Sequence, residues 1–168
     1  MKRREESTRK VRSDKKKDVQ PVVSGELKKQ LFRFAFLCRE PMKDAGERLC
    51  AIGSTSPIIM DEINCYFRRN IRIDNHQYIG YLDRPRLQIL QSKPEKITIK
   101  FPQESFEKLL NVSFALDLPL NQTAAVLLKK TITNQQFMKE YLEYHLPHLT
   151  DKERVDAQTY LKGVWQLK

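Results

Sequence analysis

Residues 96–101 read Lys96-Ile97-Thr98-Ile99-Lys100-Phe101, and this stretch decides how the chain folds around it. Apolar and polar side chains alternate strictly, which is the pattern of a β-strand that buries one face. The buried face carries Ile97, Ile99 and Phe101, and the outer face carries Lys96, Thr98 and Lys100. Pro102 ends the strand, because proline has no N–H to donate to a neighbouring strand.

Two amphipathic helices are expected after this strand. The first begins at about residue 103, and its apolar face carries Phe106, Leu109, Leu110 and Phe114. Leu118-Pro119 breaks it, and the second helix carries Leu120, Ala124, Leu127, Leu128 and Ile132 on one side. The order is therefore a strand, a helix, a short break and a second helix.

A single strand of six residues cannot satisfy its own backbone hydrogen bonds or cover its apolar face. No partner strand is obvious beside it in this part of the sequence, so we expect a second copy of the chain to supply one. Two such strands would pair antiparallel across a two-fold axis in a homodimer. Their polar faces would then form a two-stranded ribbon, which is an element that the major groove of DNA accepts.

Residues 94–132 resemble the ribbon-helix-helix DNA-binding proteins, a family that includes the Arc and MetJ repressors. The resemblance rests on the order of elements and on Asn121 near the start of the second helix. It implies that Lys96, Thr98 and Lys100 face base edges, and that backbone N–H groups at Leu120 and Asn121 hold a phosphate. Asp117 stands where this family usually has a glycine, and Pro119 where it usually has a serine or threonine cap.

A plainer alternative makes residues 96–101 an ordinary edge strand of an α+β domain. The strand would pair with a hairpin expected at 71–81, and its lysines would protect the edge from aggregation. The cationic outer face would then be exposed to solvent and would not contact DNA bases.

Residues 1–23 are expected to be a basic, disordered tail, because they hold many charges and few apolar residues. Lys2, Arg3 and Arg4 lead this segment and are candidate phosphate contacts. A solvated tail without a ligand explains the same composition equally well.

Residues 24–92 are expected to form a helical block with helices at 26–39, at 43–51 and from Pro57 through Phe67, followed by the hairpin at 71–81. The block could be a winged helix or a partner-binding domain. Asp61 and Glu62 lie in the body of the third helix and disfavour DNA reading there, so we favour the second alternative. A polar, proline-punctuated connection places a domain boundary near 90–94.

The rest of the chain is expected to be helical. Residues 93–146 form the ribbon-helix-helix segment with an added helix, whose apolar side carries Phe137, Met138, Tyr141, Leu142 and Leu146. Residues 147–168 form a C-terminal helix, either a cap on the fold or a dimer extension. The expected fold class is therefore α+β and mostly helical.

Composition limits the functional classes. The 168 residues carry a formal net charge of +10, which favours a polyanionic partner. No apolar run approaches the roughly 20 residues that cross a bilayer, so we expect no membrane partner. The charged start lacks the apolar region of a secretory signal, and three well-spaced cysteines fit reduced thiols, so we expect a cytoplasmic location.

Signatures of catalysis and of metal binding are missing from the sequence. The five glycines include no phosphate-binding loop, and Cys50, Cys65 and His76 lack the spacing of metal ligands. We therefore expect no enzymatic activity, no cofactor and no metal.

The expected function is sequence-specific binding of double-stranded DNA by a homodimer. The protein would act as a transcriptional regulator, or as an accessory DNA-binding subunit in plasmid partition or conjugation, with a protein partner bound through residues 24–92. One alternative is a protein-interaction subunit of a replication or transfer complex. The other is an RNA- or single-strand-binding protein that stacks bases on aromatic side chains between residues 66 and 81.

Overall fold

Two segments that lie far apart in the sequence pair to form an antiparallel ribbon. In the computed structural model, which describes residues 15–89 and 92–166, β1 (Lys17–Val19) pairs with β6 (Ile99–Phe101). β2 (Val22–Ser24) pairs with β5 (Pro94–Lys96). Lys17 faces Phe101 and Ser24 faces Pro94, so both ladders share one register. We call residues 17–24 and 94–101 together the ribbon.

The ribbon corrects two expectations from the sequence. The partner of residues 96–101 is neither a second copy nor the hairpin at 71–81, but residues 17–24, most of which the composition predicts to be a disordered tail. The strand is also interrupted at residues 97–98. Pro21 lies across from this point and has no N–H to donate, although its carbonyl accepts the N–H of Ile97 at 3.0 Å.

Each strand of the ribbon leads into two helices. After the first come α1 (Gly25–Leu37) and α2 (Met42–Gly53), and after the second come α4 (Gln103–Leu116) and α5 (Leu120–Thr133). The two halves match at an offset of 78 residues: Arg39 and Asp117 (117 minus 39) both adopt a positive φ between the helices. Pro41 and Pro119, two positions later, each cap the second helix. The chain is thus a repeat of strand, helix and helix.

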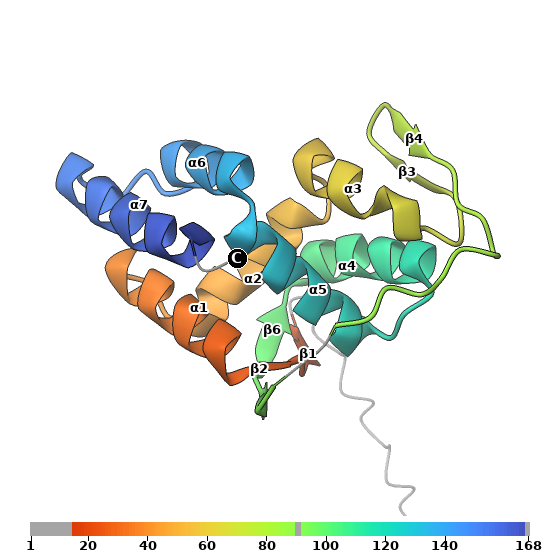
Figure 1. The fold of residues 1–168 in the computed structure, drawn as a ribbon, viewed down its shortest axis with the longest axis horizontal. Coiled ribbons are helices and arrows are strands. Elements are labelled where there is room, and N and C mark those ends of the chain that lie inside the picture. The colour runs from red at the N-terminus through yellow and green to blue at the C-terminus, as the bar shows by residue number, and fades with distance from the viewer. Residues whose placement is uncertain (1–14, 90–91, 167–168) are drawn as a thin grey trace, which may run out of the picture.

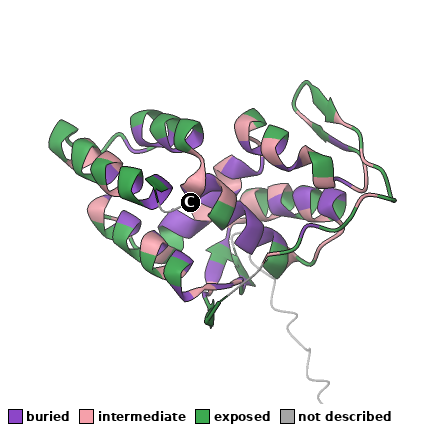
Figure 2. Cartoon of the chain, viewed as in Figure 1, coloured by how far each residue is buried: buried purple, intermediate pink, exposed green. Residues whose placement is uncertain are grey.

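The two halves share one core. α2 packs against α5, α4 and β6, and the buried faces of these elements meet on the inner side of the ribbon (Figures 1 and 2). The boundary that we expected near residues 90–94 therefore does not separate two packing units, since α1 and α2 belong with the ribbon.

The core face of the ribbon is as the alternation predicted. Ile97, Ile99 and Phe101 are buried, and the first strand adds Val19, Pro21 and Val23. The expected face of α4 is partly wrong, because Leu110 is 41% and Phe114 59% exposed. α4 packs against α2 and α5 through a face that is rotated from the expected one and keeps Leu109; its buried residues are Leu109, Val112, Ala115 and Leu116.

An insertion connects the halves. It contains α3 (Pro57–Ile63), a 3-10 turn (Asn64–Tyr66) and a hairpin of β3 (Ile71–Ile73) and β4 (His76–Tyr78). The hairpin is confirmed, with Asp74 at φ 52° in its turn, and its two strands pair with each other. The third helix is shorter than expected, because the chain tightens into the 3-10 turn before Phe67.

α6 (Gln135–Tyr144) and α7 (Asp151–Gln166) complete the described chain. The apolar residues predicted for the added helix are buried. α7 packs on α1, α5 and α6, and Trp165 Nε1 donates to the carbonyl of Ile132 at 3.1 Å. α6 and α7 lie at one end of the molecule and α3 with the hairpin at the other (Figure 1).

Candidate nucleic-acid interface

The outer face of the ribbon carries the three side chains that the sequence singled out. Lys96 and Lys100 are exposed and Thr98 is half-buried, while the residues between them lie in the core. The strand thus separates a polar face from an apolar one, residue by residue.

The first strand contributes three more side chains to the same face: Asp18, Gln20 and Val22. Asp18 lies opposite Lys100, and Val22 lies opposite Lys96. Because the register is constant, Gln20 and Thr98 lie at the centre. Asp18 and Gln20 are exposed and Val22 is half-buried. The outer face therefore presents two ammonium groups, one carboxylate, one amide, one hydroxyl and one apolar group.

The sequence does not predict these three side chains as contacts, because the composition of residues 1–23 predicts a tail there. The sequence carries a weaker signal for them, since Val19, Pro21 and Val23 stand at every second position before an amphipathic helix, although Val22 interrupts the alternation with polar residues. A short extended segment followed by an amphipathic helix is also the order of elements at residues 96–116. The many basic residues before Val19 favour a disordered tail, so the short strand is not predicted from composition.

The second helix of each half begins without a side-chain cap. Pro119 precedes α5 and its carbonyl accepts the N–H of Thr123 at 2.9 Å, so the first turn begins at Leu120 and Asn121, the predicted phosphate contacts. Their backbone N–H groups lie in the first turn of the helix, where N–H groups have no hydrogen-bond acceptor within the helix. In α2 the equivalent positions are Met42 and Lys43.

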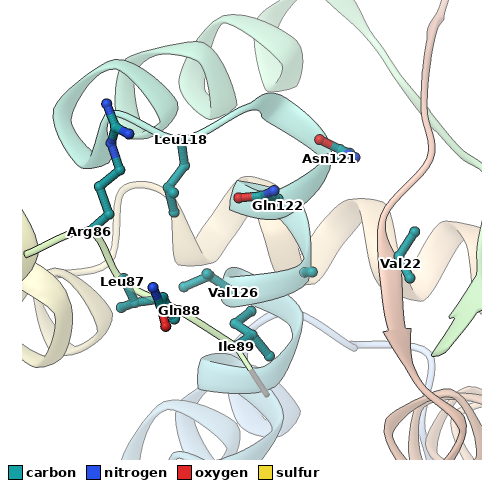
Figure 3. Close-up of a pocket in the computed structure, with 10 residues that line it drawn as sticks. Val22, Arg86, Leu87, Gln88, Ile89, Leu118, Asn121, Gln122 and Val126 are labelled. Atoms are coloured by element: carbon teal, nitrogen blue, oxygen red, sulfur yellow. The ribbon is translucent and has the colours of Figure 1, made fainter. Parts of the chain in front are cut away.

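A groove of about 510 Å³ lies between the ribbon and the first turns of α5. Figure 3 shows Asn121 and Gln122 on α5, Arg86 and Gln88 on the segment that passes beside it, and Val22 on the ribbon strand across from them. Arg86 and Gln88 were not among the predicted contacts. The groove thus joins the outer face of the ribbon to the predicted phosphate site.

Three arginines surround Asp117 at the turn between α4 and α5. Its carboxylate contacts Arg68 at 3.1 Å, Arg69 at 3.3 Å and Arg86 at 2.8 Å. Arg86 and its companions hold the pKa of Asp117 below its usual value. One carboxylate cannot balance three guanidinium groups, so positive charge remains beside the start of α5, and Arg86 is the most exposed of the three.

Lys2, Arg3 and Arg4, the remaining predicted phosphate contacts, lie outside the described residues. Within residues 15–89 and 92–166, no three His, Cys, Asp or Glu side chains are grouped so as to hold a metal ion. Over the same ranges, no helix combines the length and the apolar character needed to cross a bilayer. Comparison with known proteins finds no matching family model, no similar curated protein and no similar solved structure.

Proposed function

We propose that this chain binds double-stranded DNA sequence-specifically by placing the ribbon in the major groove, in the manner of the ribbon-helix-helix family that residues 94–132 resemble. One observation carries the proposal. A single chain holds two strand-helix-helix halves, and their strands pair into a ribbon whose outward side chains are polar except for Val22.

The dimensions and chemistry of the ribbon support this use. The major groove of B-DNA is about 12 Å wide and admits a two-stranded ribbon. Lys96 and Lys100 can donate to guanine O6 and N7, Gln20 can pair with an adenine edge, and Thr98 can donate or accept. The net charge of +10 favours the polyanion through counterion release.

Backbone contacts would come from the helices that flank the ribbon. The first turns of α2 and α5 offer N–H groups and the positive end of a helix dipole to phosphates. Arg86 would add a guanidinium beside the α5 site, since both line the same groove. Lys2, Arg3 and Arg4 would add affinity that does not depend on sequence.

The working unit in this proposal is one chain. We expected a homodimer because residues 96–101 needed a second strand, and residues 17–24 of the same chain fill that role. The biological role that we propose is regulation of transcription, or an accessory DNA-binding function in plasmid partition or conjugation.

Footprinting of the full chain on DNA from its own genetic neighbourhood tests the proposal. Lys100→Ala and Thr98→Ala should each lower discrimination between the footprinted site and a scrambled duplex by about 1–3 kcal/mol. Lys139→Ala, on the exposed side of α6 away from the ribbon, is the matched control and should bind like the parent. Parent-like binding of both duplexes by both ribbon variants would refute the proposal.

A further inference from the structure

The outer face of the ribbon lacks the two-fold symmetry that its backbone approximates. At the offset of 78 residues that relates Arg39 to Asp117 (117 minus 39), Asp18 corresponds to Lys96, Gln20 to Thr98 and Val22 to Lys100. In a ribbon built from two identical chains, each of these pairs would hold the same residue. Here every pair differs in charge, hydrogen-bonding capacity or polarity.

The two ends of the ribbon consequently present different chemistry. At one end the carboxylate of Asp18 lies opposite the ammonium group of Lys100. At the other end the isopropyl group of Val22 lies opposite the ammonium group of Lys96. The first end offers an acceptor and a donor, whereas the second end offers methyl groups and a donor. The two ends therefore cannot recognise the same base pair equally well.

The flanks of the ribbon differ in the same sense. The groove at the Val22 end is lined by Asn121, Gln122 and Arg86. At the other end β6 packs against α2, whose first turn carries Lys43 and the carboxylate of Asp44. Backbone contacts at the two ends would therefore also be unequal.

We propose that the ribbon recognises a non-palindromic DNA site and binds it in one orientation. This inference rests on the proposed function. At the first end, Asp18 accepts from a cytosine amino group while Lys100 donates to guanine, which selects a G·C pair. At the second end, Lys96 donates to guanine and Val22 contacts a thymine methyl group, and between them Gln20 favours adenine.

Selection from a random duplex library with the full chain tests this directly. The expected consensus has no dyad symmetry. Replacing one half of the selected site by the inverted copy of the other half should weaken binding roughly 5- to 150-fold for each base pair that the ribbon can no longer recognise.

A variant with a symmetric outer face provides the matched comparison. Asp18→Lys, Gln20→Thr and Val22→Lys together give both strands the same outward residues, and none of these three positions is fully buried. This variant should favour a palindrome made from the half-site that the second strand reads. Continued preference for the parent's asymmetric site would overturn the inference, and the melting temperature checks that the variant is folded.

A probe on Cys65 can report the orientation of the protein on its DNA site. Cys65 is an exposed thiol in the insertion between the two halves, and the second half is not followed by an equivalent insertion. A DNA-cleaving reagent coupled to Cys65 should cut one side of the selected site, and Cys65→Ser should abolish the cutting. A palindromic consensus cut equally on both sides would overturn the inference and leave the proposed function standing. Selection that enriches no sequence would remove the proposed function and, with it, the inference.

Discussion

Arg39 and Asp117 adopt almost the same left-handed backbone conformation, with φ of 54° and 55°, at the break between the two helices of each half. Asparagine and aspartate tolerate this region more readily than arginine does. The two turns are stabilised differently as well. Arg39 reaches Glu153 at 2.9 Å and the carbonyl of His148 at 2.9 Å, whereas Asp117 receives its three arginines.

Asp117→Asn should separate the backbone role of this residue from its charge. Asparagine keeps the left-handed turn, so the loss of stability at neutral pH reports the interaction with Arg68, Arg69 and Arg86. The pKa of Asp117 is lowered from its usual 3.8, so this stabilisation is complete above that value and is lost as pH falls through the folded pKa. Urea denaturation should show parent above variant at pH 7 and the two converging in strong acid. A difference that is constant over this range would contradict the electrostatic explanation.

Residues 17–23 should be required for folding, although their composition resembles a tail. A chain that begins at Lys15 keeps the whole ribbon and should unfold at a temperature close to that of the parent. A chain that begins at Gly25 exposes the edge of residues 94–101 and the apolar side chains that Val19 and Val23 cover. Circular dichroism should show a large loss of cooperative unfolding for the second chain. Equal melting curves for both would mean that the strand pairing is not needed.

The sequence predicted helices and strands well where a regular spacing of apolar residues marked the element. It predicted strand pairing poorly, because the paired residues lie far apart in the sequence. The alternation at 96–101, the helix at 26–39 and the two helices on either side of the break at Leu118-Pro119 needed only local information. The pairing of Val19 with Ile99 joins residues 80 positions apart (99 minus 19), and no local pattern encodes that choice. The sequence did not reveal the strand-helix-helix repeat, because the two halves share the spacing of their elements but few identical residues. Phe114 illustrates the same limit, since its exposed ring packs under Arg69, 4.5 Å from the guanidinium, and not in the core.

Gly53 should be required where α2 crosses α5. A Cβ atom added there would lie 2.7 Å from Cγ2 of Thr131, whose buried hydroxyl is bonded to the carbonyl of Leu127 at 2.7 Å and cannot easily move. Gly53→Ala should therefore destabilise the protein even though alanine favours helices by about 1 kcal/mol. Gly163→Ala in α7 is the control, because nothing lies within 4 Å of its added Cβ. Chemical denaturation should give opposite signs for the two substitutions, and a stabilising Gly53→Ala would contradict the close crossing.

The three thiols should differ sharply in reactivity. Cys65 is exposed, whereas Cys38 and Cys50 are buried. Burial raises the pKa of Cys38 to about 12 and raises that of Cys50 as well, so neither forms the reactive thiolate near neutral pH. A thiol-specific chromogenic reagent should label one cysteine rapidly in the native protein and three in denaturant. Rapid labelling of Cys65→Ser at neutral pH would show that the core opens readily.

Adjacent residues of the ribbon should have opposite effects on stability. Ile99 is fully buried, and its Cδ1 lies so close to α2 that a Cβ on Gly46 would come within 3.0 Å of it. Ile99→Ala should cost about 2–5 kcal/mol of unfolding free energy, because it removes apolar contacts and leaves a cavity.

Lys100→Ala should change stability by no more than about 0.5 kcal/mol, because the side chain is exposed. Its neighbour across the ribbon is Asp18, and removing the ammonium group leaves a solvated carboxylate that needs no buried partner. Urea titrations of both variants at one pH and salt concentration measure the contrast. A large loss in Lys100→Ala would show that this side chain holds the ribbon together, and its effect on DNA discrimination could then no longer be assigned to base contacts.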